Sequence, residues 1–512
     1  MTPAKASQHG RLPRGHFHRS LWLGAAALAW CGGCSVGPDY HRPEPLATEP
    51  MPAAFSGATS VTNGPVWTQA QPAAGVPRGE WWSVFDETEL DRLESLASAQ
   101  NQDLAAAMSR FEEARQQVKV ARADFFPQIS AGAAAVRQRT SVNAPQSGKA
   151  TGASYTYNTF TVPADLSWEL DLWGRVRRQT ESAKAQLQAS ADDLESIKLA
   201  IQSEVASDYF ILRALDSEYR IVASTIETFR RSLELTINRR KGGVASDLDV
   251  SQAETQLRST EAQLPAIELQ AANVRHALAT LCGVPATGFV VAVSGTNAAP
   301  VPSVPVSLPS ELLERRPDVA AAERRMAAAN ANIGVAKSAF YPRVFLTGLA
   351  GFQSVSASTL FDWPSRAWAL GPSVQLPLFT GGRNRAELEI ARSFYTETVA
   401  NYREIVLTAF QEVEDGLAAG RLLAAQLDAE SAALASAERT LTIANNRYKA
   451  GLVTYLEVAV AQGSELSSQQ TVVQLQGQCL VAQVALIKAL GGGWHATAEG
   501  TASADGTAPS VP

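Results

Sequence analysis

Two glycine turns in the sequence are each followed by a hydroxyl residue and, three positions later, by a carboxylate. Ser246 precedes Asp249 after the first turn, and Thr454 precedes Glu457 after the second. This spacing predicts a capping box, in which side chains accept hydrogen bonds from backbone N–H groups that a helix start leaves free. The negative charge also suits the positive end of the helix dipole. The simplest chemistry of these carboxylates is therefore local stabilisation of a helix.

A second role arises if several copies of the chain meet around an axis. One carboxylate per copy then makes a ring of charge that attracts cations and narrows a pore. Gly243 and Gly451 suit the left-handed position that ends a helix. The apolar residues of these turns, Val244, Leu452 and Val453, would be unfavourable in water unless a partner covers them. Alternatively, they pack within their own hairpins.

The N-terminus holds a cysteine that could be modified. Basic residues precede an apolar run from Leu21 to Trp30, and the segment CGGC ends at Cys34. This order is typical of a cleaved signal peptide, and the run is too short to span a bilayer as a mature helix. We expect residues 1–33 to be removed and Cys34 to become a lipidated first residue. The alternative is an ordinary secretory peptide with a chance cysteine.

The remaining composition argues against several kinds of site. Cys282 and Cys479 stand alone in apolar stretches and are expected to be buried thiols. The His residues are dispersed without a metal-ligand spacing, and no nucleophile lies near a base in a recognisable motif. Lys and Arg are scattered in a chain of net charge −6. We therefore expect no enzyme activity, no metal or cofactor, and no nucleic-acid partner.

The two turns belong to a unit that occurs twice. NRRKGGVASDLDV matches NRYKAGLVTYLEV 208 residues later, and ARADFFPQI and ELDLWGRVR have counterparts in AKSAFYPRV and QLPLFTGGRNR, in the same order. These matches predict a duplicated unit of roughly two hundred residues. We expect an N-terminal extended segment at 34–89, the first repeat at 90–290, a Pro-rich linker at 291–310, the second repeat at 311–493 and a disordered tail at 494–512.

Each repeat predicts the same order of elements. A helix ends at a Phe-Pro or Tyr-Pro step, since proline lacks a donor and clashes with the preceding turn. Two alternating strands follow, then a very long helix, the glycine turn and a return helix. The expected strands are 128–138, 157–171, 343–353 and 366–379. The expected helices are 90–124, 178–240 and 246–281 in the first repeat, and 311–340, 384–449 and 454–490 in the second.

The strands decide the fold class that we predict. TFTVPADLSWELDL alternates apolar and polar residues, as a transmembrane barrel strand does, although a half-buried soluble strand also alternates. Four strands cannot close a barrel, because the smallest have about eight and lipid tolerates no open edge. We therefore expect several chains to share one barrel. The fold would be mainly α with a small β part, its coiled-coil-like helices reaching roughly 100 Å. A soluble helical bundle would leave the strands unexplained.

Four motifs carry a resemblance to a known family. They are CSVGPDYHRP from Cys34, LLERRPDVAAAERRMAAANANIGVAKSAFYP from Leu312, AFQEVEDGLAA from Ala409, and KALGGGW ending at Trp494. With these motifs the chain resembles the outer membrane factor family, the TolC-like exit ducts, and most closely its lipoprotein branch related to NodT and OprM. The resemblance covers about residues 34 to 494 and supports Cys34 as the lipidated residue.

The resemblance implies a homotrimer in the outer membrane of a Gram-negative bacterium. Three chains would complete a twelve-stranded barrel, and an α-helical barrel would extend through the periplasm to a periplasmic adaptor protein and an inner-membrane pump. The duct would passively conduct small molecules such as drugs. The same duct could serve metal-ion efflux or type I protein secretion, although few Met and scattered His argue weakly against metal ions. A lipid-anchored structural protein without a channel is the remaining alternative.

The resemblance also implies roles for the residues of the two glycine turns. Matched on RYKAG, Glu457 falls on an acidic gate position and Leu456 on an apolar constriction, whereas Val460 stands where the family commonly has Asp. This departure suggests a more apolar periplasmic gate. The other expected gate residues are Arg447, Tyr448 and Tyr455, which would bond between neighbouring helices, and Asp247 and Asp249 in the first repeat. The expected adaptor contacts are Gly243, Val244, Ser246, Gly451, Leu452, Val453 and Thr454.

Overall fold

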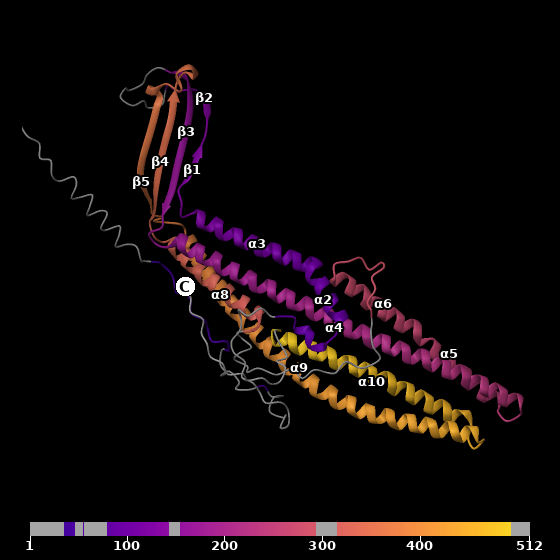
Figure 1. The fold of residues 1–512 in the computed structure, drawn as a ribbon. Helices are drawn as coiled ribbons and strands as arrows, with labels where there is room; N and C mark the ends of the chain where they lie inside the picture. The colour runs from indigo at the N-terminus through magenta and orange to yellow at the C-terminus, as the bar shows by residue number, and fades with distance from the viewer. Residues whose placement is uncertain (1–34, 47–54, 56–78, 143–153, 293–314, 493–512) are drawn as a thin grey trace, which may run out of the picture. The chain divides into compact units, whose positions relative to one another are not determined.

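The computed structural model describes residues 35–46, 55, 79–142, 154–292 and 315–492 (Figure 1). The chain forms two compact units, each drawing on both sequence repeats. We call them the sheet unit, which comprises residues 1–43, 112–188 and 323–400, and the hairpin unit, which comprises 44–111, 189–322 and 401–512. The expected signal peptide, Cys34 and the expected tail lie outside the described residues, as does nearly all of the expected linker. The repeat boundaries remain a prediction from the sequence.

The sheet unit contains one antiparallel sheet. Its strands are β1 (Gln128–Ala131), β2 (Ala134–Arg139), β3 (Thr156–Leu170), β4 (Arg343–Ser354) and β5 (Arg366–Gln375). β3 pairs with β4 and β4 with β5, while β1 and β2 pair one after the other with the second edge of β3. The outer edges of β5 and of β1 and β2 are unpaired within the described chain. Two short 3-10 turns, η3 (Ala357–Thr359) and η4 (Trp363–Ser365), connect β4 to β5.

Prolines explain where the strands depart from the prediction. We expected one strand over 128–138, but it is split between Ala131 and Ala134, although both pieces keep the same register with β3. Pro163 faces the gap, accepts a hydrogen bond from the Gly132 N–H and has no N–H to return. The fourth strand ends at Gln375 rather than 379, because Pro377 removes the next donor.

The register gives the sheet two different faces. Residues directly opposite each other on neighbouring strands point to the same side. Leu166 therefore shares a face with Gly348 and Leu370, whereas Ser167 shares the other with Thr347. The apolar face includes Phe160, Val162, Leu166 and Trp168 of β3, Val344, Leu346 and Phe352 of β4, and Trp368, Leu370 and Val374 of β5. The more polar face includes Thr161, Asp165, Ser167 and Glu169 of β3, Thr347 and Gln353 of β4, and Ser373 and Gln375 of β5.

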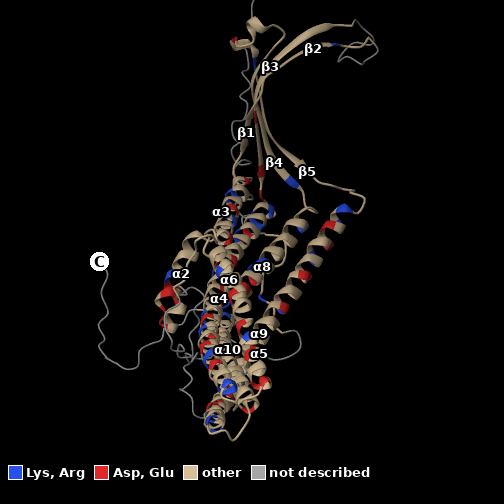
Figure 2. Ribbon diagram, turned by 90° about the vertical axis from the view of Figure 1, so that its right-hand side faces the viewer, with Lys and Arg blue, Asp and Glu red and all other residues tan. Residues whose placement is uncertain are grey.

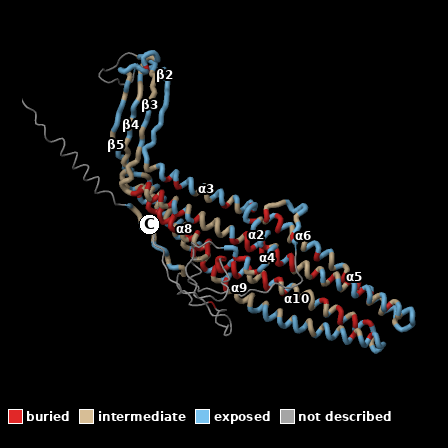
Figure 3. Tube along the Cα trace, viewed as in Figure 1, coloured by how far each residue is buried: buried red, intermediate tan, exposed pale blue. Residues whose placement is uncertain are grey.

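Neither face of the sheet is covered by the described chain. Every residue of the five strands is exposed or half-buried, as the pale blue and tan strands of Figure 3 show. Charged residues are sparse on the strands and frequent on the helices (Figure 2). Trp368 is 79% exposed on the apolar face. Such a surface requires a covering medium or partner.

The start of the described chain is fixed to the sheet unit. The Val36 N–H donates to the Trp173 carbonyl at 3.0 Å, just after β3 ends. Gly37 packs so closely on Gly334 that a Cβ on Gly37 would lie 2.5 Å from the Gly334 Cα. The Asn330 amide donates to the Pro38 carbonyl at 3.1 Å. Residues 36–38 are therefore held against the sheet unit, directly after the expected lipidation site.

Eight helices are described in the chain. They are α2 (Thr88–Gln100), α3 (Gln102–Ala123), α4 (Arg175–Lys241), α5 (Asp247–Glu261), α6 (Gln263–Leu281), α8 (Pro317–Ser338), α9 (Arg383–Lys449) and α10 (Tyr455–Ala489). By length and composition alone, α10 could cross a membrane, but 50% of its most apolar stretch is buried inside the protein, as in a core helix.

Two helices that we predicted as continuous are interrupted. The helix expected over 90–124 breaks at Asn101, whose side chain accepts from the Leu104 N–H and donates to the Leu281 carbonyl. Asn101 thus starts α3 as a cap and holds the end of α6. The return helix expected over 246–281 breaks at Ala262, close before Pro265, which cannot donate to the preceding turn. The second-repeat counterpart α10 contains no proline and stays continuous.

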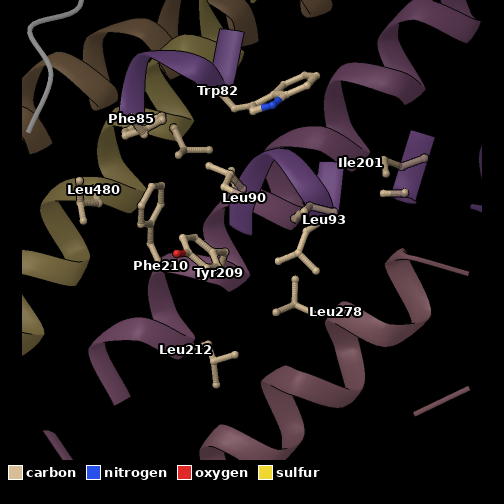
Figure 4. Close-up of a cluster of buried hydrophobic side chains, with 14 of the residues drawn as sticks. Trp82, Phe85, Leu90, Leu93, Ile201, Tyr209, Phe210, Leu212, Leu278 and Leu480 are labelled. Atoms are coloured by element: carbon tan, nitrogen blue, oxygen red, sulfur yellow. The ribbon is translucent and has the colours of Figure 1, made fainter. Parts of the chain in front are cut away.

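The core of the hairpin unit lies where α2 meets α4, α6 and α10 (Figure 4). Leu90 and Leu93 of α2 and Tyr209 of α4 are fully buried there together with Leu278 of α6. Each buried side chain of this size contributes about 1.5–3 kcal/mol relative to exposure. The short 3-10 helix η2 (Trp81–Phe85) adds its aromatic rings to the same cluster. The expected buried thiols are found, since Cys282 lies in this cluster and Cys479 is also buried.

Candidate gate and contact site at the hairpin tips

Both hairpin tips of the hairpin unit have the same backbone. Gly243 follows α4 with φ +75°, and Gly451 follows α9 with φ +73°. The Val244 N–H reaches back to the Arg239 carbonyl at 2.8 Å, and the Leu452 N–H reaches back to the Arg447 carbonyl at 3.0 Å. This six-residue closure with a left-handed residue is the Schellman motif. The predicted glycine ends of both long helices are therefore present.

The first tip contains the capping box that its spacing predicts. Asp249 accepts a hydrogen bond from the Ser246 N–H at 2.9 Å, and the Asp249 N–H donates to the Ser246 hydroxyl at 3.2 Å. Replacing such a cap costs about 0.5–2 kcal/mol. Asp247, the other acidic residue of this tip, is exposed and forms an ion pair with Arg240 across the turn.

The second tip lacks the capping box, so the prediction for Thr454 and Glu457 is wrong in this respect. The Thr454 side chain accepts no capping hydrogen bond. Glu457 instead lies 3.3 Å from Arg447, and both side chains are about half exposed. An exposed pair of this kind contributes about 0–1 kcal/mol. The Glu457 carboxylate is therefore only loosely held.

Asp249 joins the two tips. Its Oδ1 accepts a hydrogen bond from the Tyr455 N–H, the first amide of α10, at 3.2 Å, while its Oδ2 accepts one from the Ser246 N–H. Partial burial acts to raise the pKa of Asp249, but these hydrogen bonds and the charge of Arg239 outweigh it and hold that pKa below its ordinary value. One carboxylate from the first repeat thus caps helices of both repeats, which explains why α10 needs no cap of its own.

Arg239, which the sequence did not single out, strengthens the same junction. Its guanidinium lies 4.6 Å from the centre of the Tyr448 ring and donates to the Lys449 carbonyl at 3.3 Å. A cation at the carboxyl end of α9 offsets the negative end of its dipole, and the ring contact adds a cation–π interaction. The repeat could have indicated this residue, because Arg239 and the predicted Arg447 are 208 positions apart.

Tyr448 and Tyr455 form the centre of the junction. They are 5% and 1% exposed, and their rings meet edge-on with centres 5.7 Å apart. The Tyr448 hydroxyl lies 3.4 Å from the Thr236 hydroxyl of α4, and the Tyr455 hydroxyl donates to Gln462 at 3.1 Å. Burial, with Tyr448 contributing, raises the pKa of Tyr455 to about 12. Both rings hold helices of one chain together.

Most apolar residues of the tips remain uncovered. Val244, Leu452, Leu456 and Val460 are all at least half exposed, whereas Val453 packs against the tyrosine cluster. Of the three apolar turn residues, Val453 alone follows the alternative in which they pack within the hairpin. Leu248 is 65% exposed and was also missed by the sequence interpretation, although it matches Leu456 across the repeat.

The exposed residues of the tips offer charge and apolar surface. Among the described residues, no group of three or more His, Cys, Asp or Glu side chains lies close enough to hold a metal ion. The exposed Glu457 carboxylate and the Leu456 and Val460 side chains next to it lie on the first turns of α10. Such a surface can line an opening or contact a partner.

Comparison with known proteins places this architecture in a family. The model of the outer membrane efflux protein family matches residues 93–284 and 308–492. The chain belongs to this family. The match includes both hairpins and all five strands.

Several curated relatives of this outer membrane efflux protein are named as efflux pump components. It is 34% identical to the probable efflux pump outer membrane protein TtgC of Pseudomonas putida, over 93% of this chain and 96% of the relative. It is 33% identical to the outer membrane protein OprJ of Pseudomonas aeruginosa, over 90% and 94% of the two chains.

Solved structures share the fold. The outer-membrane channel OprN superposes with a TM-score of 0.81 at 30% identity, covering 90% of this chain and all of that chain. The open state of the Neisseria gonorrhoeae MtrE channel superposes with a TM-score of 0.74 at 29% identity, covering 90% and 98%. The predicted mainly helical fold with a small sheet, the outer-membrane location and the role in efflux are confirmed. The roles of the individual tip residues stay predictions.

Proposed function

We propose that this outer membrane efflux protein is the exit duct of a tripartite pump, built from three copies of the chain. The observation that carries the proposal is the sheet, which has an apolar face, a more polar face and two edges that are unpaired within the described chain. In lipid an unpaired edge is not tolerated. Edge-to-edge closure of three sheets would pair every strand, with the apolar faces toward lipid and the polar faces toward a lumen.

The long helices would carry the duct through the periplasm. α4 and α9 contain 67 residues each, which corresponds to roughly 100 Å of helix. This length exceeds the roughly 30 Å hydrocarbon core of a bilayer several-fold. The hairpin tips would then lie at the periplasmic entrance, where exposed Val244 and Leu452 offer apolar contacts to an adaptor protein coupled to an inner-membrane pump.

The second tip would form the gate. Glu457, Leu456 and Val460 are exposed, so in a trimer they could face the axis. Three Glu457 carboxylates, each only loosely paired with Arg447 at 3.3 Å, would favour cations. The rings of three Leu456 and three Val460 side chains would make an apolar constriction. The buried contact between Tyr448 and Tyr455 would hold these three residues in position.

The cargo would be small apolar or amphipathic molecules. The curated relatives include a toluene efflux pump component, an antibiotic efflux pump component and a solvent efflux pump component, all from Pseudomonas putida. No residue of this chain would perform chemistry on the cargo, which would pass by diffusion through the lumen.

Lipidation of Cys34 would anchor the duct. The adjoining Ser35 and Val36 lie against Gly174 and Trp173 at the end of β3, which would place an acyl chain on residue 34 beside the membrane strands. Metabolic labelling with palmitate should mark the wild-type protein, and Cys34→Ser should remove the label. A labelled C34S protein would reject this anchor.

The channel itself is tested in a planar bilayer. Purified full-length protein should give small, cation-preferring single-channel currents and the mass of a trimer. A well-folded protein that inserts into the bilayer yet conducts nothing would overturn the duct and favour a structural lipoprotein.

A further inference from the structure

A cavity of about 760 Å³ lies within the sheet unit, beside the helix ends that lead to the strands. It lies between the last turn of α3, the first turns of α4 and the Arg324–Ala327 segment of α8. Tyr40 of the N-terminal segment forms part of the wall. Neither the predicted gate nor the predicted adaptor contacts involve these residues.

The charged lining of the cavity is mainly cationic. Arg122, Arg177, Lys184 and Arg324 line it, with Glu181 as the acidic lining residue. Other groups already compensate two of these cations, because Arg177 pairs with Asp171 and Arg324 with Glu323. Glu181 in turn pairs with Arg178. The cavity therefore retains positive charge.

Two cations remain available to a ligand. Arg122 on α3 and Lys184 on α4 are both exposed. Within the described ranges, neither side chain forms an ion pair with a carboxylate. An unpaired arginine and lysine on facing elements suit a phosphate group, which accepts charge-assisted hydrogen bonds from both.

The rest of the wall combines apolar and aromatic residues with the polar Thr180 and Gln188. Phe125 and Phe126 line the cavity together with Ala185 and Ala327. Phe126 is 69% exposed and stands two residues before β1 begins. The Phe125 carbonyl accepts from the Trp168 indole N–H of β3 at 3.0 Å. Aromatic residues of this kind concentrate where membrane strands meet the polar surface of the bilayer. These rings would not contribute to the binding of a free phosphate ion.

We propose that this cavity binds the headgroup of an anionic phospholipid. The phosphate would lie between Arg122 and Lys184, and an acyl chain would follow Phe126 toward the apolar face of the sheet. The inference rests on the proposed function in one respect, that the strands cross the outer membrane. It adds a lipid-specific site at the periplasmic base of the barrel, next to the N-terminal segment.

The test measures which lipid remains bound. Three full-length proteins are compared: the wild type, the cavity variant Arg122→Gln/Lys184→Gln and the control Arg115→Gln/Lys119→Gln. Each is reconstituted with equal amounts of phosphatidylglycerol and phosphatidylethanolamine. It is then extracted in mild detergent and examined by native mass spectrometry. The control removes the same two charges from exposed positions of α3 that do not line the cavity. Wild type and control should retain phosphatidylglycerol preferentially, and the cavity variant should retain about tenfold less.

Each of the following results would overturn the proposal. Equal retention in wild type and cavity variant would exclude the cavity as the lipid site. Displacement of the signal by millimolar inorganic phosphate would assign it to free anions. Loss of the trimer in the cavity variant, with lipid retained, would make the cavity a contact between copies. Conductance of the same wild-type sample tests the duct separately, so a conducting protein without lipid preference rejects this inference alone.

Discussion

The two hairpin tips have matching sequences 208 residues apart but are built differently. In the first tip, Asp249 completes a capping box and also caps the helix of the second tip. At the matching position of the second tip, Glu457 has no capping role and stays exposed. Asp247 is exposed, whereas its counterpart Tyr455 is buried. The comparison indicates that the first tip braces the junction, which leaves the second tip free to present its carboxylate.

The largest expected effect concerns the buried ring. Tyr455→Ala would leave a cavity between the hairpins and should lower the free energy of opening the tip by about 3–5 kcal/mol. Tyr455→Phe keeps the ring and should cost about 1–2 kcal/mol, because Gln462 loses a buried hydrogen-bond donor. Hydrogen exchange at the starts of α5 and α10 measures both. Asp247→Ala, the matched change in the first tip, should change the free energy of opening the tip by at most about 0.5 kcal/mol. Equal effects of Y455A and D247A would show that the tips do not differ.

The shared carboxylate should come next. Asp249→Ala removes the cap of α5 and the acceptor for the Tyr455 amide, and should destabilise the junction by about 1–2 kcal/mol. Amide exchange should quicken in both hairpins, since one side chain serves both. Exchange that quickens in the first hairpin alone would restrict Asp249 to a local cap.

An added carboxylate should show which of the two tips determines the cation preference of the channel. Val460→Asp places a second acidic residue three positions after Glu457 and should raise the cation preference of single-channel currents. The matched first-repeat change is Gln252→Asp, which should leave the preference nearly unchanged if the second tip alone lines the entrance. A larger response to Q252D would reverse this assignment.

The smallest expected effect is a pH dependence of the stability that Asp249 contributes to the junction of the two tips. The pKa of Asp249 is lowered in the folded protein, so the stability it contributes is present above its unfolded value of about 3.9. That stability is lost as the pH falls through the lower folded value. Exchange at the Tyr455 amide, corrected for intrinsic rates, should therefore be constant from about pH 7 to 5 and quicken only below about pH 4. In Asp249→Asn this step should vanish, and an unchanged step would assign it to another group.

Much of this molecule could be predicted from its sequence because the signals are local. The repeat, the glycine ends of α4 and α9, and the alternation of the strands depend on neighbouring residues. The interruptions at Pro163, Asn101 and Ala262 depend on proline chemistry or on a distant partner such as the Leu281 carbonyl. Asn101 could not be interpreted without the packing of α6.

The tips show where sequence spacing is insufficient. Ser246 with Asp249 and Thr454 with Glu457 have identical spacing, yet only the first pair forms a capping box. The difference arises because Asp249 reaches the Tyr455 amide 206 residues away. Arg239 and Leu248 could have been found by extending the 208-residue match from the predicted Arg447 and Leu456.

Single-channel currents of Glu457→Ala and Asp249→Asn in planar bilayers test whether the second tip is the gate and the first tip holds it in place. Glu457→Ala should lower the cation preference while the rate of opening changes little. Asp249→Asn should keep the preference and make openings more frequent, because the junction is looser. A cation preference that is indifferent to Glu457 but lost in Asp249→Asn would contradict this assignment and place the charged constriction at the first tip.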